Sequence, residues 1–388
     1  MTQRALGRFG GLSFMYFAAI GLFNPYAPLW FQSLGFSTLV IGGIAAVQSW
    51  TRVFAPYAWS WAGDHSGRRV ELIRMAAAGA LLSAAGLLGV TQAVPVALVT
   101  GLLFIANSGV VPLYEATVAR LLHTEDGIDP AGYGRVRVWG SVGFIVSVTA
   151  FGALLEWRGI AIFPAFVAAM NALLLGAALR LPATRAAAEH DEPAPPVLPL
   201  LKRPEVAWFF ASVFFTVLAH TSLYAFFSLY LVELGYGKGA VGALWAVGVA
   251  VEIAFFWTQG SWFRLVSANR WLQVAAGVSA LRFVAIAAGG AWAPVLVLAQ
   301  MTHAVTFAAH HAACIALVHR YFPDRLRGRG QALYTMLGYG LSGVLGGLGG
   351  GWLILHLGFA SVFWAAALCA LAGWGCARRA EHHDRGAA

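Results

Sequence analysis

Three ionisable residues stand out because of where they lie. Glu252, Arg282 and His303 each fall inside an apolar run that is long enough to cross a bilayer. An ionisable group at the middle of a membrane costs roughly 2.5–3.5 kcal/mol, so each of them needs a reason to be there. Apolar surroundings favour the neutral carboxyl of Glu252, whereas an approaching arginine favours the carboxylate and expels its proton. We therefore predict a proton-coupling site; the alternative is a static ion pair that only holds helices together.

A second acid–base pair, Glu115 and Arg137, lies close to one membrane surface. Glu115 stands near the end of the fourth apolar run and Arg137 near the start of the fifth. The arginine could hold a carboxylate through two parallel hydrogen bonds, and the pair could bind polar groups of a small molecule. The alternative is a salt bridge that closes a gate at the membrane surface.

Other polar and aromatic residues at mid-span depth could line a small-molecule site. Arg52, 200 residues before Glu252, could bind an anionic ligand, pair with Glu115 or snorkel to the surface. Asn107 or Gln300 could equally form hydrogen bonds between helices. Many of the fifteen tryptophans belong at the membrane interface. The residues predicted to bind a substrate are Arg52, Glu115, Arg137, Trp139, Asn24, Gln48, Asn107, His220, Tyr224, Trp245 and His311.

Composition shows which solvent surrounds these residues. Of the 388 residues, 60% are hydrophobic and only 11% are charged, whereas about a quarter of a soluble chain is charged. Lipid must therefore be the solvent for most of the chain. The net charge of +9 would suggest nucleic acid in a soluble protein, but here the arginines are loop charges, and no nucleic-acid partner is predicted. The three cysteines show no metal or redox spacing, and no cofactor or metal is predicted.

The elements that must position the candidate residues are membrane-spanning helices. About 20 apolar residues are needed to cross a bilayer, and twelve runs approach or exceed that length. They cover residues 9–33, 40–62, 72–91, 95–119, 136–156, 160–180, 206–233, 240–262, 271–291, 293–317, 330–355 and 359–377. We predict an all-α membrane protein with twelve transmembrane helices.

Basic residues predict the orientation of these helices. With the amino terminus inside, nearly all of the 25 lysines and arginines fall on the cytoplasmic side. Only Arg158 and Lys238 fall outside, and only Arg52 and Arg282 lie within spans. This bias follows the positive-inside rule. We expect a multi-pass, monomeric protein of a bacterial cytoplasmic (inner) membrane, with both termini in the cytoplasm.

The chain divides into two similar halves. The one long polar stretch, 183–204, is rich in proline and reads as a cytoplasmic linker. It separates two six-helix bundles, residues 1–182 and 205–388. Leu34-Gly35-Phe36 recurs 200 residues later as Leu234-Gly235-Tyr236. Two six-span halves of like topology predict pseudo-symmetric parallel repeats.

The loop between spans two and three carries a recognisable motif. The segment Ser60–Arg69 reads SWAGDHSGRR and resembles the major facilitator superfamily signature G-x-x-x-D-x-x-G-R-R/K, with Ser60 in place of the first glycine. Gly67 permits a tight turn, and Asp64 can receive a basic partner or the next helix's amino end. The resemblance implies a gating role for Asp64, Gly67, Arg68 and Arg69, together with the major facilitator fold.

Two further stretches resemble one branch of that superfamily. Tyr133–Ser141 (YGRVRVWGS) and Gly242–Glu252 (GALWAVGVAVE) look like the phenylpropionate permease group and, more distantly, the lactose permease group. Glu252, Arg282 and His303 follow one another in the order in which lactose permease-like symporters place their coupling residues. Glu115 and Arg137 match an acid–base pair that contacts sugar in those symporters. The resemblance implies proton-coupled import of a small organic solute.

Together these features predict a proton symporter rather than an enzyme. Because of Arg52 and Arg137 and the closer branch, the expected substrate is an aromatic carboxylate such as a phenylpropionate-like acid. A sugar or nucleoside symporter and an efflux carrier are the alternatives. Span five (136–156) has no proline, which disfavours efflux carriers with a glycine–proline signature there. No G-x-x-x-x-G-K-[ST] loop occurs, which excludes a nucleotide-driven pump.

Overall fold

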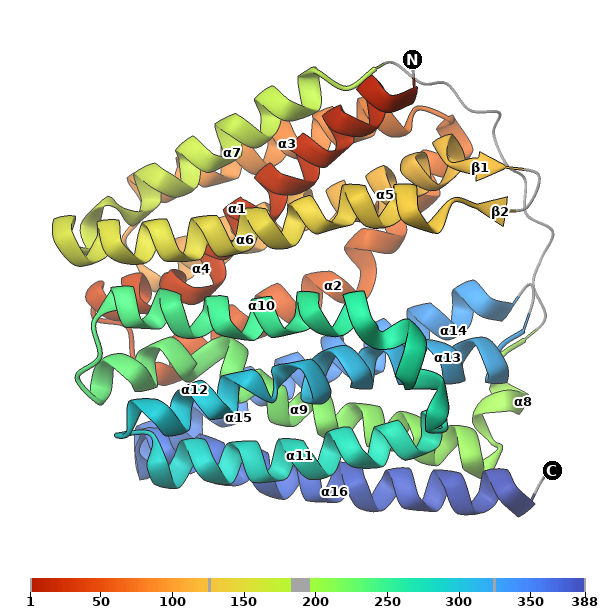
Figure 1. Ribbon diagram of the computed structural model, residues 1–388. Coiled ribbons are helices and arrows are strands. Elements are labelled where there is room, and N and C mark those ends of the chain that lie inside the picture. Colours follow the sequence, from red (N-terminus) through yellow and green to blue (C-terminus); the bar gives the residue numbers. More distant parts are fainter. Residues whose placement is uncertain (1, 125–126, 183–195, 324–325, 387–388) are drawn as a thin grey trace. The chain divides into compact units, whose positions relative to one another are not determined.

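The computed structural model describes residues 2–124, 127–182, 196–323 and 326–386, and almost all of them are helical (Figure 1). The helices are α1 Thr2–Ser33, α2 Thr38–Ser66, α3 Arg69–Gly86, η1 Leu87–Gly89, α4 Ala93–Asn107, α5 Val110–Leu121, α6 Pro130–Arg158, η2 Ile160–Ile162, α7 Phe163–Leu179, α8 Leu198–Leu201, α9 Pro204–Glu233, α10 Lys238–Trp262, η3 Phe263–Leu265, α11 Ala268–Gly289, α12 Ala293–Met301, η4 Ala304–Ala309, α13 His310–Tyr321, α14 Arg327–Leu333, η6 Tyr334–Leu341, α15 Ser342–Leu357 and α16 Phe359–Gly386. The short strands β1 His123–Thr124 and β2 Gly127–Ile128 pair antiparallel.

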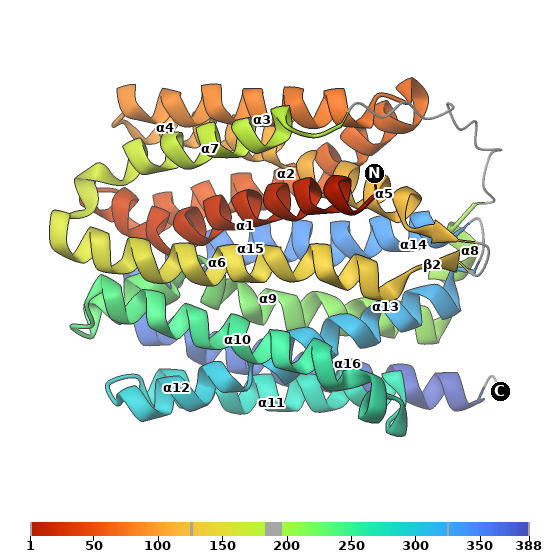
Figure 2. The same cartoon turned by 45° about the horizontal axis from the view of Figure 1, so that its top comes forward.

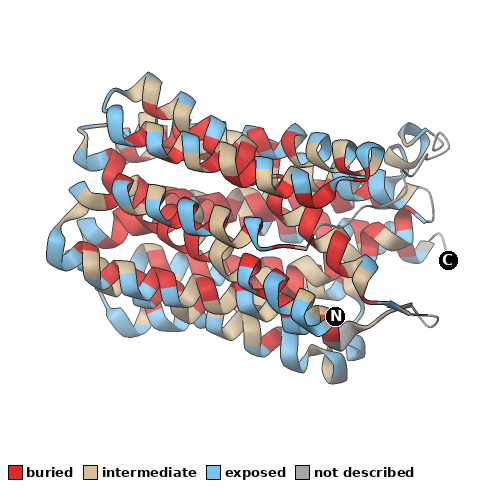
Figure 3. Ribbon diagram, turned by 90° about the horizontal axis from the view of Figure 1, so that it is seen from above, coloured by how far each residue is buried: buried red, intermediate tan, exposed pale blue. Residues whose placement is uncertain are grey.

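Twelve helical spans among the described residues are long and apolar enough to cross a membrane. This confirms the predicted all-α membrane fold. Large apolar side chains such as Leu82, Leu281 and Leu368 remain exposed on the helices. Figure 3 shows exposed positions on the helix faces that turn away from the buried ones. Such an apolar outer surface suits contact with lipid.

The chain folds as two compact units. Unit 1 comprises Met1–Phe36, Phe54–His190 and Gly237–Ala246, and unit 2 comprises Ser37–Val53, Asp191–Tyr236 and Val247–Ala388. The units therefore follow the two halves of the chain except at the first parts of α2 and α10, which are exchanged. Of the predicted linker 183–204, residues 183–195 lie outside the described part of the chain.

Unit 1 has a core built from α1, α3, α5, α6 and α7. Helices α1 and α6 approach each other closely: a Cβ on Gly143 would lie 2.3 Å from the carbonyl oxygen of Phe14. The Ser147 hydroxyl donates to the Ala18 carbonyl at 2.6 Å across the same contact. Small residues and interhelical hydrogen bonds are the usual means of holding helices together where lipid removes the hydrophobic drive.

The first turn of α10 is anchored within unit 1 by a carboxylate and a phenol. Glu156, at the end of α6, accepts hydrogen bonds from the backbone N–H groups of Lys238 and Gly239. Tyr26 on α1 donates to the Val148 carbonyl at 2.7 Å and reaches the Lys238 carbonyl at 3.3 Å. A carboxylate suits a helix N-terminus because the unpaired N–H groups there carry partial positive charge.

Unit 2 has a core in which α9, α11, α13 and α16 pack together. The first part of α2 joins this unit through α15, where Thr38 Oγ1 donates to the Gly351 carbonyl at 2.9 Å. A Cβ on Gly42 would lie 2.0 Å from the Gly347 carbonyl oxygen, so only glycine permits this approach.

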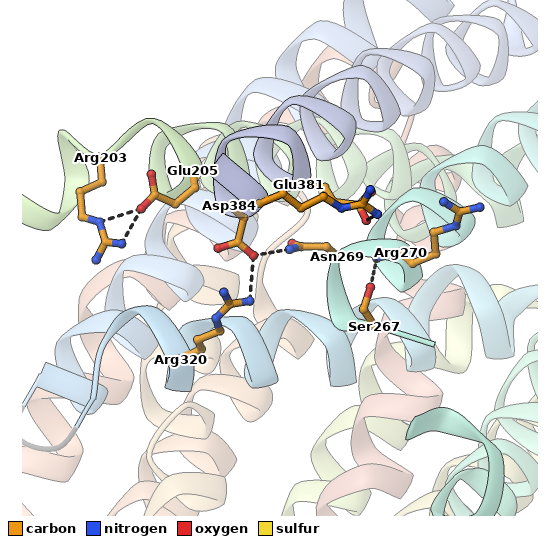
Figure 4. A network of polar contacts seen from close by, with 9 residues as sticks. Arg203, Glu205, Ser267, Asn269, Arg270, Arg320, Glu381 and Asp384 are labelled. Carbon is orange, nitrogen blue, oxygen red and sulfur yellow. Dashed lines mark hydrogen bonds and ion pairs between the residues drawn. The ribbon is translucent and has the colours of Figure 1, made fainter. Parts of the chain in front are cut away.

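A polar network ties the end of α16 to its neighbours in unit 2 (Figure 4). Asp384 accepts from Asn269 Nδ2 at 2.6 Å and from Arg320 Nη1 at 2.7 Å. Gln273 Nε2 donates to Glu381 at 2.5 Å. These contacts explain why α16 continues to Gly386, well beyond the predicted end of its apolar run at residue 377.

The internal repeat reappears in the turns. Gly35 and Gly235 have φ of 81° and 88°, a left-handed conformation that glycine adopts without steric cost. Each ends its helix in the same way: the Phe36 amide donates to the Phe31 carbonyl, and the Tyr236 amide donates to the Leu231 carbonyl. This is the Schellman ending of an α-helix.

Among the described residues, three spans are interrupted in their interior. Span four breaks at Ser108–Gly109, where the Trp59 indole fills the break and donates to the Ile105 carbonyl at 2.9 Å. The span formed by α12, η4 and α13 contains a π-helical turn at η4, and the span formed by α14, η6 and α15 contains another at η6. Such interruptions in transport proteins tend to mark binding sites.

Candidate functional site

A buried arginine organises the polar centre of unit 2. Arg282, on α11, is 2% exposed. Its Nη1 donates to Thr306 Oγ1 at 2.9 Å and to His303 Nδ1 at 3.1 Å, and its Nη2 donates to Gln300 Oε1 at 2.5 Å. These acceptors all come from α12 and the η4 region that follows it. Among the described residues no carboxylate lies within ion-pair distance of Arg282, so neutral groups solvate the cation.

The bond from Arg282 fixes the protonation of His303. A guanidinium can only donate, so His303 Nδ1 must accept and the imidazole must be neutral, with its proton on Nε2. That Nε2 lies 3.8 Å from Glu252 Oε2. One imidazole therefore separates the carboxylate on α10 from the guanidinium on α11. The three residues predicted for proton coupling are adjacent in the structure.

Two tyrosines and a second arginine surround this acid. Tyr224, on α9, is within electrostatic range of Glu252, Arg282 and Arg52. Tyr339, on η6, is within range of both Glu252 and Arg52. Arg52 is exposed and makes no ion pair within the part of the chain that the structure describes. Unit 2 thus contains two arginines near one carboxylate, one buried and one accessible.

A short hydrogen-bonded chain leads away from Tyr339. Its hydroxyl lies 3.2 Å from the Tyr334 hydroxyl, which lies 3.0 Å from His311 Nδ1. Hydroxyl and imidazole groups both donate and accept, so such a chain can pass a proton along its length. It extends from the neighbourhood of Glu252 to α13.

His311 is also aligned with His303 through a stack of rings. The His303 and Phe307 rings are 5.0 Å apart and inclined by 4°, and the Phe307 and His311 rings are 6.2 Å apart and inclined by 11°. The intervals of four residues place all three rings on one face of the helix. Phe307 therefore separates two histidines that belong to the same polar region.

Unit 1 holds the other predicted pair in a more open setting. Arg137 Nη1 on α6 donates to Glu115 Oε1 on α5 at 2.5 Å, with 54% and 29% of the two side chains exposed. Tyr133 lies within electrostatic range of both of them. The buried Tyr114 lies beside this group and 3.5 Å from Ser13 Oγ.

The predicted gating motif forms the turn between α2 and α3. Asp64 accepts from Arg69 Nη2 at 2.7 Å, and Arg68 lies 3.6 Å from Glu71. Gly67, between the helices, has φ of 65°, which a residue with a side chain would adopt only under strain. The basic partner that the sequence suggested for Asp64 is therefore a residue of the same motif.

The remaining candidates are divided between the units. His220 is buried, with its Nδ1 2.8 Å from the Thr216 carbonyl and its ring edge-to-face with Phe283. Two buried polar atoms, Asn107 Oδ1 and His220 Nε2, find no hydrogen-bond partner among the described residues. Such atoms cost about 1–3 kcal/mol unless water or a ligand satisfies them. Unit 1 also contains Asn24, Trp139 and Trp245, and unit 2 also contains Gln48.

The sequence did not single out Thr306, Phe307, Tyr334 or Tyr339 as members of this site. Tyr334 and Tyr339 are five residues apart, which places them about 140° apart around an α-helix. The π-helical turn η6 makes residues i and i+5 neighbours, and so the two hydroxyls meet. Phe307 had a visible signal, the spacing of four between His303, Phe307 and His311.

Residues 7–365 match the model of the MFS_1 like family. The chain belongs to this family of the major facilitator superfamily. The twelve spans, the turn at Gly67 and the repeated turns at Gly35 and Gly235 agree with that assignment. The predicted membership of the major facilitator superfamily is thereby confirmed.

Curated relatives of this family member include two carriers. A probable 3-phenylpropionic acid transporter of Escherichia coli (strain K12) is 28% identical over 363 residues, covering 92% of this chain and 93% of the relative. A maltose permease of Geobacillus stearothermophilus is 29% identical over 374 residues, covering 93% and 90%. The resemblance to the phenylpropionate group therefore extends over nearly the whole chain.

Solved structures of the same fold include the nucleoside transporter NupG. It superposes with a TM-score of 0.84 at 17% identity, covering 97% of this chain and 98% of NupG. The POT family transporter PepTSo superposes with a TM-score of 0.80 at 10% identity, covering 98% of each chain. The protein is a multi-pass secondary transporter of small molecules, not an enzyme.

Proposed function

We propose that this transporter is a proton-coupled symporter that imports a small aromatic carboxylate of the phenylpropionate type by alternating access. The observation that carries the proposal is the arrangement of Glu252, His303 and Arg282, in which a neutral imidazole links an acid to a buried guanidinium. An acid at mid-membrane is expected to exchange a proton during transport.

Charge balance explains how a proton and an anion could move together. With Glu252 ionised, its negative charge offsets the Arg282 cation across His303. Protonation of Glu252 removes that charge, and the cluster then carries an excess positive charge in a poorly solvating environment. Binding of an anionic substrate nearby restores neutrality, so the proton and the carboxylate favour each other's binding. Arg282 keeps its neutral acceptors throughout.

Arg52 is the group best suited to the substrate carboxylate. It is exposed, lies within electrostatic range of Tyr224 and Tyr339, and makes no ion pair in the described part of the chain. Phenol rings provide an apolar surface for an aromatic ring, and a guanidinium can hold a carboxylate bidentately. The relative named as a probable 3-phenylpropionic acid transporter supports this substrate class.

A sugar is the second candidate. The relative named maltose permease is as similar in sequence as the phenylpropionate relative. The Glu115–Arg137–Tyr133 group in unit 1 combines donors and acceptors that could bind several hydroxyls. Nucleoside import is a weaker alternative, since only the fold likeness to NupG supports it. Efflux is disfavoured by the lack of a proline in span five (136–156).

Uptake into proteoliposomes would separate these candidates. The purified protein should accumulate radiolabelled 3-phenylpropionate when the lumen is more alkaline than the medium, and a protonophore should stop the accumulation. Maltose and uridine serve as matched test solutes under the same gradient. Proton-driven accumulation of maltose without any uptake of arylpropionates would overturn the proposed substrate. Uptake that does not depend on the pH gradient would overturn the proposal of proton coupling.

The proposed setting is a bacterial cytoplasmic membrane, with a monomeric protein and both termini in the cytoplasm. The arginine distribution supports the orientation. Single cysteines introduced at Arg4 and at Lys238, in a background lacking the three native cysteines, should differ in labelling by an impermeant maleimide in intact cells. Labelling at position 4 and protection at position 238 would reverse the orientation.

A further inference from the structure

A groove lies in unit 1 between α1 and α7, and none of the polar groups described above lines it. Its volume is about 500 Å³. Figures 1 and 2 both draw α1 beside α7, and the two helices pack against each other. The groove is lined by Arg4, Gly7, Arg8, Gly11, Met15, Ala172, Leu173, Gly176, Ala177 and Arg180. We call it the α1–α7 groove.

The α1–α7 groove has a basic end. Arg4 and Arg8 are one helical turn apart on α1, and Arg180 caps the carboxyl end of α7. All three are exposed, and their side chains make no ion pair or hydrogen bond with any described residue. The guanidinium that donates to carbonyls at this end of α7 is that of Arg74, which reaches the Ala178 carbonyl at 3.4 Å and the Leu181 carbonyl at 2.8 Å. Three cations therefore line one groove, and none of them has an acidic partner among the described residues.

The rest of the α1–α7 groove is apolar and empty of side chains at its glycines. A Cβ built on Gly7, Gly11 or Gly176 would meet no atom within 4 Å. From Arg4 to Met15 the groove follows eleven helical steps, which is about 16 Å. That length is close to the hydrocarbon depth of one leaflet, about 15 Å. The groove therefore has the polarity and length of a single phospholipid.

We propose that the α1–α7 groove binds an anionic phospholipid, with its phosphate on Arg4, Arg8 and Arg180 and an acyl chain along the glycines. Guanidinium groups bind phosphate oxygens bidentately, and basic pockets between transmembrane helices bind anionic headgroups. A zwitterionic lipid carries its own cation beside the phosphate and gains less from three arginines. The site is independent of proton coupling and of the transported substrate.

Native mass spectrometry of the full-length protein, titrated in detergent with phosphatidylglycerol or phosphatidylcholine, tests the charge requirement. Each arginine near an anionic headgroup contributes roughly fivefold in affinity, so the triple variant Arg4→Gln, Arg8→Gln, Arg180→Gln should bind phosphatidylglycerol on the order of a hundredfold more weakly. The matched control, Arg264→Gln, Arg270→Gln, Arg327→Gln, removes the same charge from exposed residues elsewhere. It should bind as the wild type does.

A steric variant tests the acyl-chain position without changing charge. Gly176→Leu fills the groove, and it should reduce phosphatidylglycerol retention while leaving the melting temperature in lipid-free detergent unchanged. Gly375→Leu, at another glycine with open space beside it, is the control and should retain the lipid.

Equal binding of the two lipids, equal loss in both arginine triples, or full competition by sn-glycerol 3-phosphate would overturn the proposal. So would a large gain in lipid binding on neutralising Glu189, Asp191 and Glu192, because it would make the chain's own acidic segment the resident partner.

Discussion

The two units accommodate an acid and an arginine within their transmembrane helices in different ways. Unit 1 pairs Glu115 directly with Arg137 at 2.5 Å, in a position where both side chains remain substantially exposed. Unit 2 buries Arg282 among neutral acceptors and keeps Glu252 one imidazole away. An exposed pair is screened by water and contributes about 0–1 kcal/mol to stability. Solvent cannot compensate a buried cation for a lost partner; both Nη atoms of Arg282 are hydrogen-bonded, and its Nε finds no partner among the described residues.

This difference bears on which unit can host a proton. Protonation of Glu115 would break its direct bond with Arg137 but would leave both groups in contact with solvent. Protonation of Glu252, whose side chain is 23% exposed, changes the charge beside the buried Arg282 and His303 while the Arg282 hydrogen bonds to Thr306 and Gln300 stay in place. The second arrangement allows a reversible charge change without dismantling the packing around it. Substitutions in the two units should therefore differ greatly in their effects.

The largest effect is expected for Glu252→Gln. Glutamine keeps the shape but cannot exchange a proton, so uptake against a gradient should be abolished while counterflow persists. Both are measured in proteoliposomes with labelled substrate. Glu233→Gln, at the exposed end of α9, is the matched control and should accumulate substrate normally. Unimpaired proton-driven accumulation by Glu252→Gln would contradict the assignment of the proton site.

Arg282→Lys should be nearly as damaging, although it conserves the charge. The ammonium of the shorter lysine side chain cannot donate hydrogen bonds to Gln300, Thr306 and His303 together, because the positions of these acceptors match the planar guanidinium. Each buried acceptor left without a donor costs about 1–3 kcal/mol. A clear drop in melting temperature and a loss of most initial uptake are expected. Arg264→Lys, at an exposed position, should change neither, and a wild-type melting temperature for Arg282→Lys would show that its three bonds contribute little.

An intermediate effect is expected for Tyr339→Phe. Removing this hydroxyl breaks the chain to Tyr334 and His311 at a cost of about 1 kcal/mol in stability. If this chain of hydrogen bonds carries protons to Glu252, proton-driven uptake should slow much more than counterflow does. Tyr57→Phe, on an exposed side chain of α2, provides the comparison. An equal slowing of both transport modes would point to substrate contact or packing instead.

The smallest effect on stability is expected for Glu115→Gln, within about 1 kcal/mol, because the pair with Arg137 is exposed. Its effect on transport distinguishes the two interpretations of this pair. A raised KM with unchanged maximal rate would indicate substrate contact, whereas a changed maximal rate with unchanged KM would indicate a gate. Arg137→Gln should follow the same pattern. A large fall in melting temperature for either variant would contradict the comparison between the units.

The fold could be read from the sequence because lipid imposes strong local rules. Each span needs about 20 apolar residues with internal backbone hydrogen bonding, so the twelve runs were visible one at a time. The turns at Gly35 and Gly235 were visible as a repeat because only glycine adopts their φ values readily. The end of α16 was not foreseen, because Asn269 and Arg320, far away in sequence, supply the partners that extend it.

The candidate site was only partly accessible to the same reasoning. Glu252, Arg282 and His303 could be named because an ionisable group in an apolar run is conspicuous without any knowledge of its neighbours. The sequence by itself therefore determined which residues are unusual. Only the tertiary structure decided that His303 is the neutral bridge, and that Tyr334 and Tyr339 meet across a π-helical turn. Those facts depend on the direction of a hydrogen bond and on a local helical period, and neither can be recognised from any single residue.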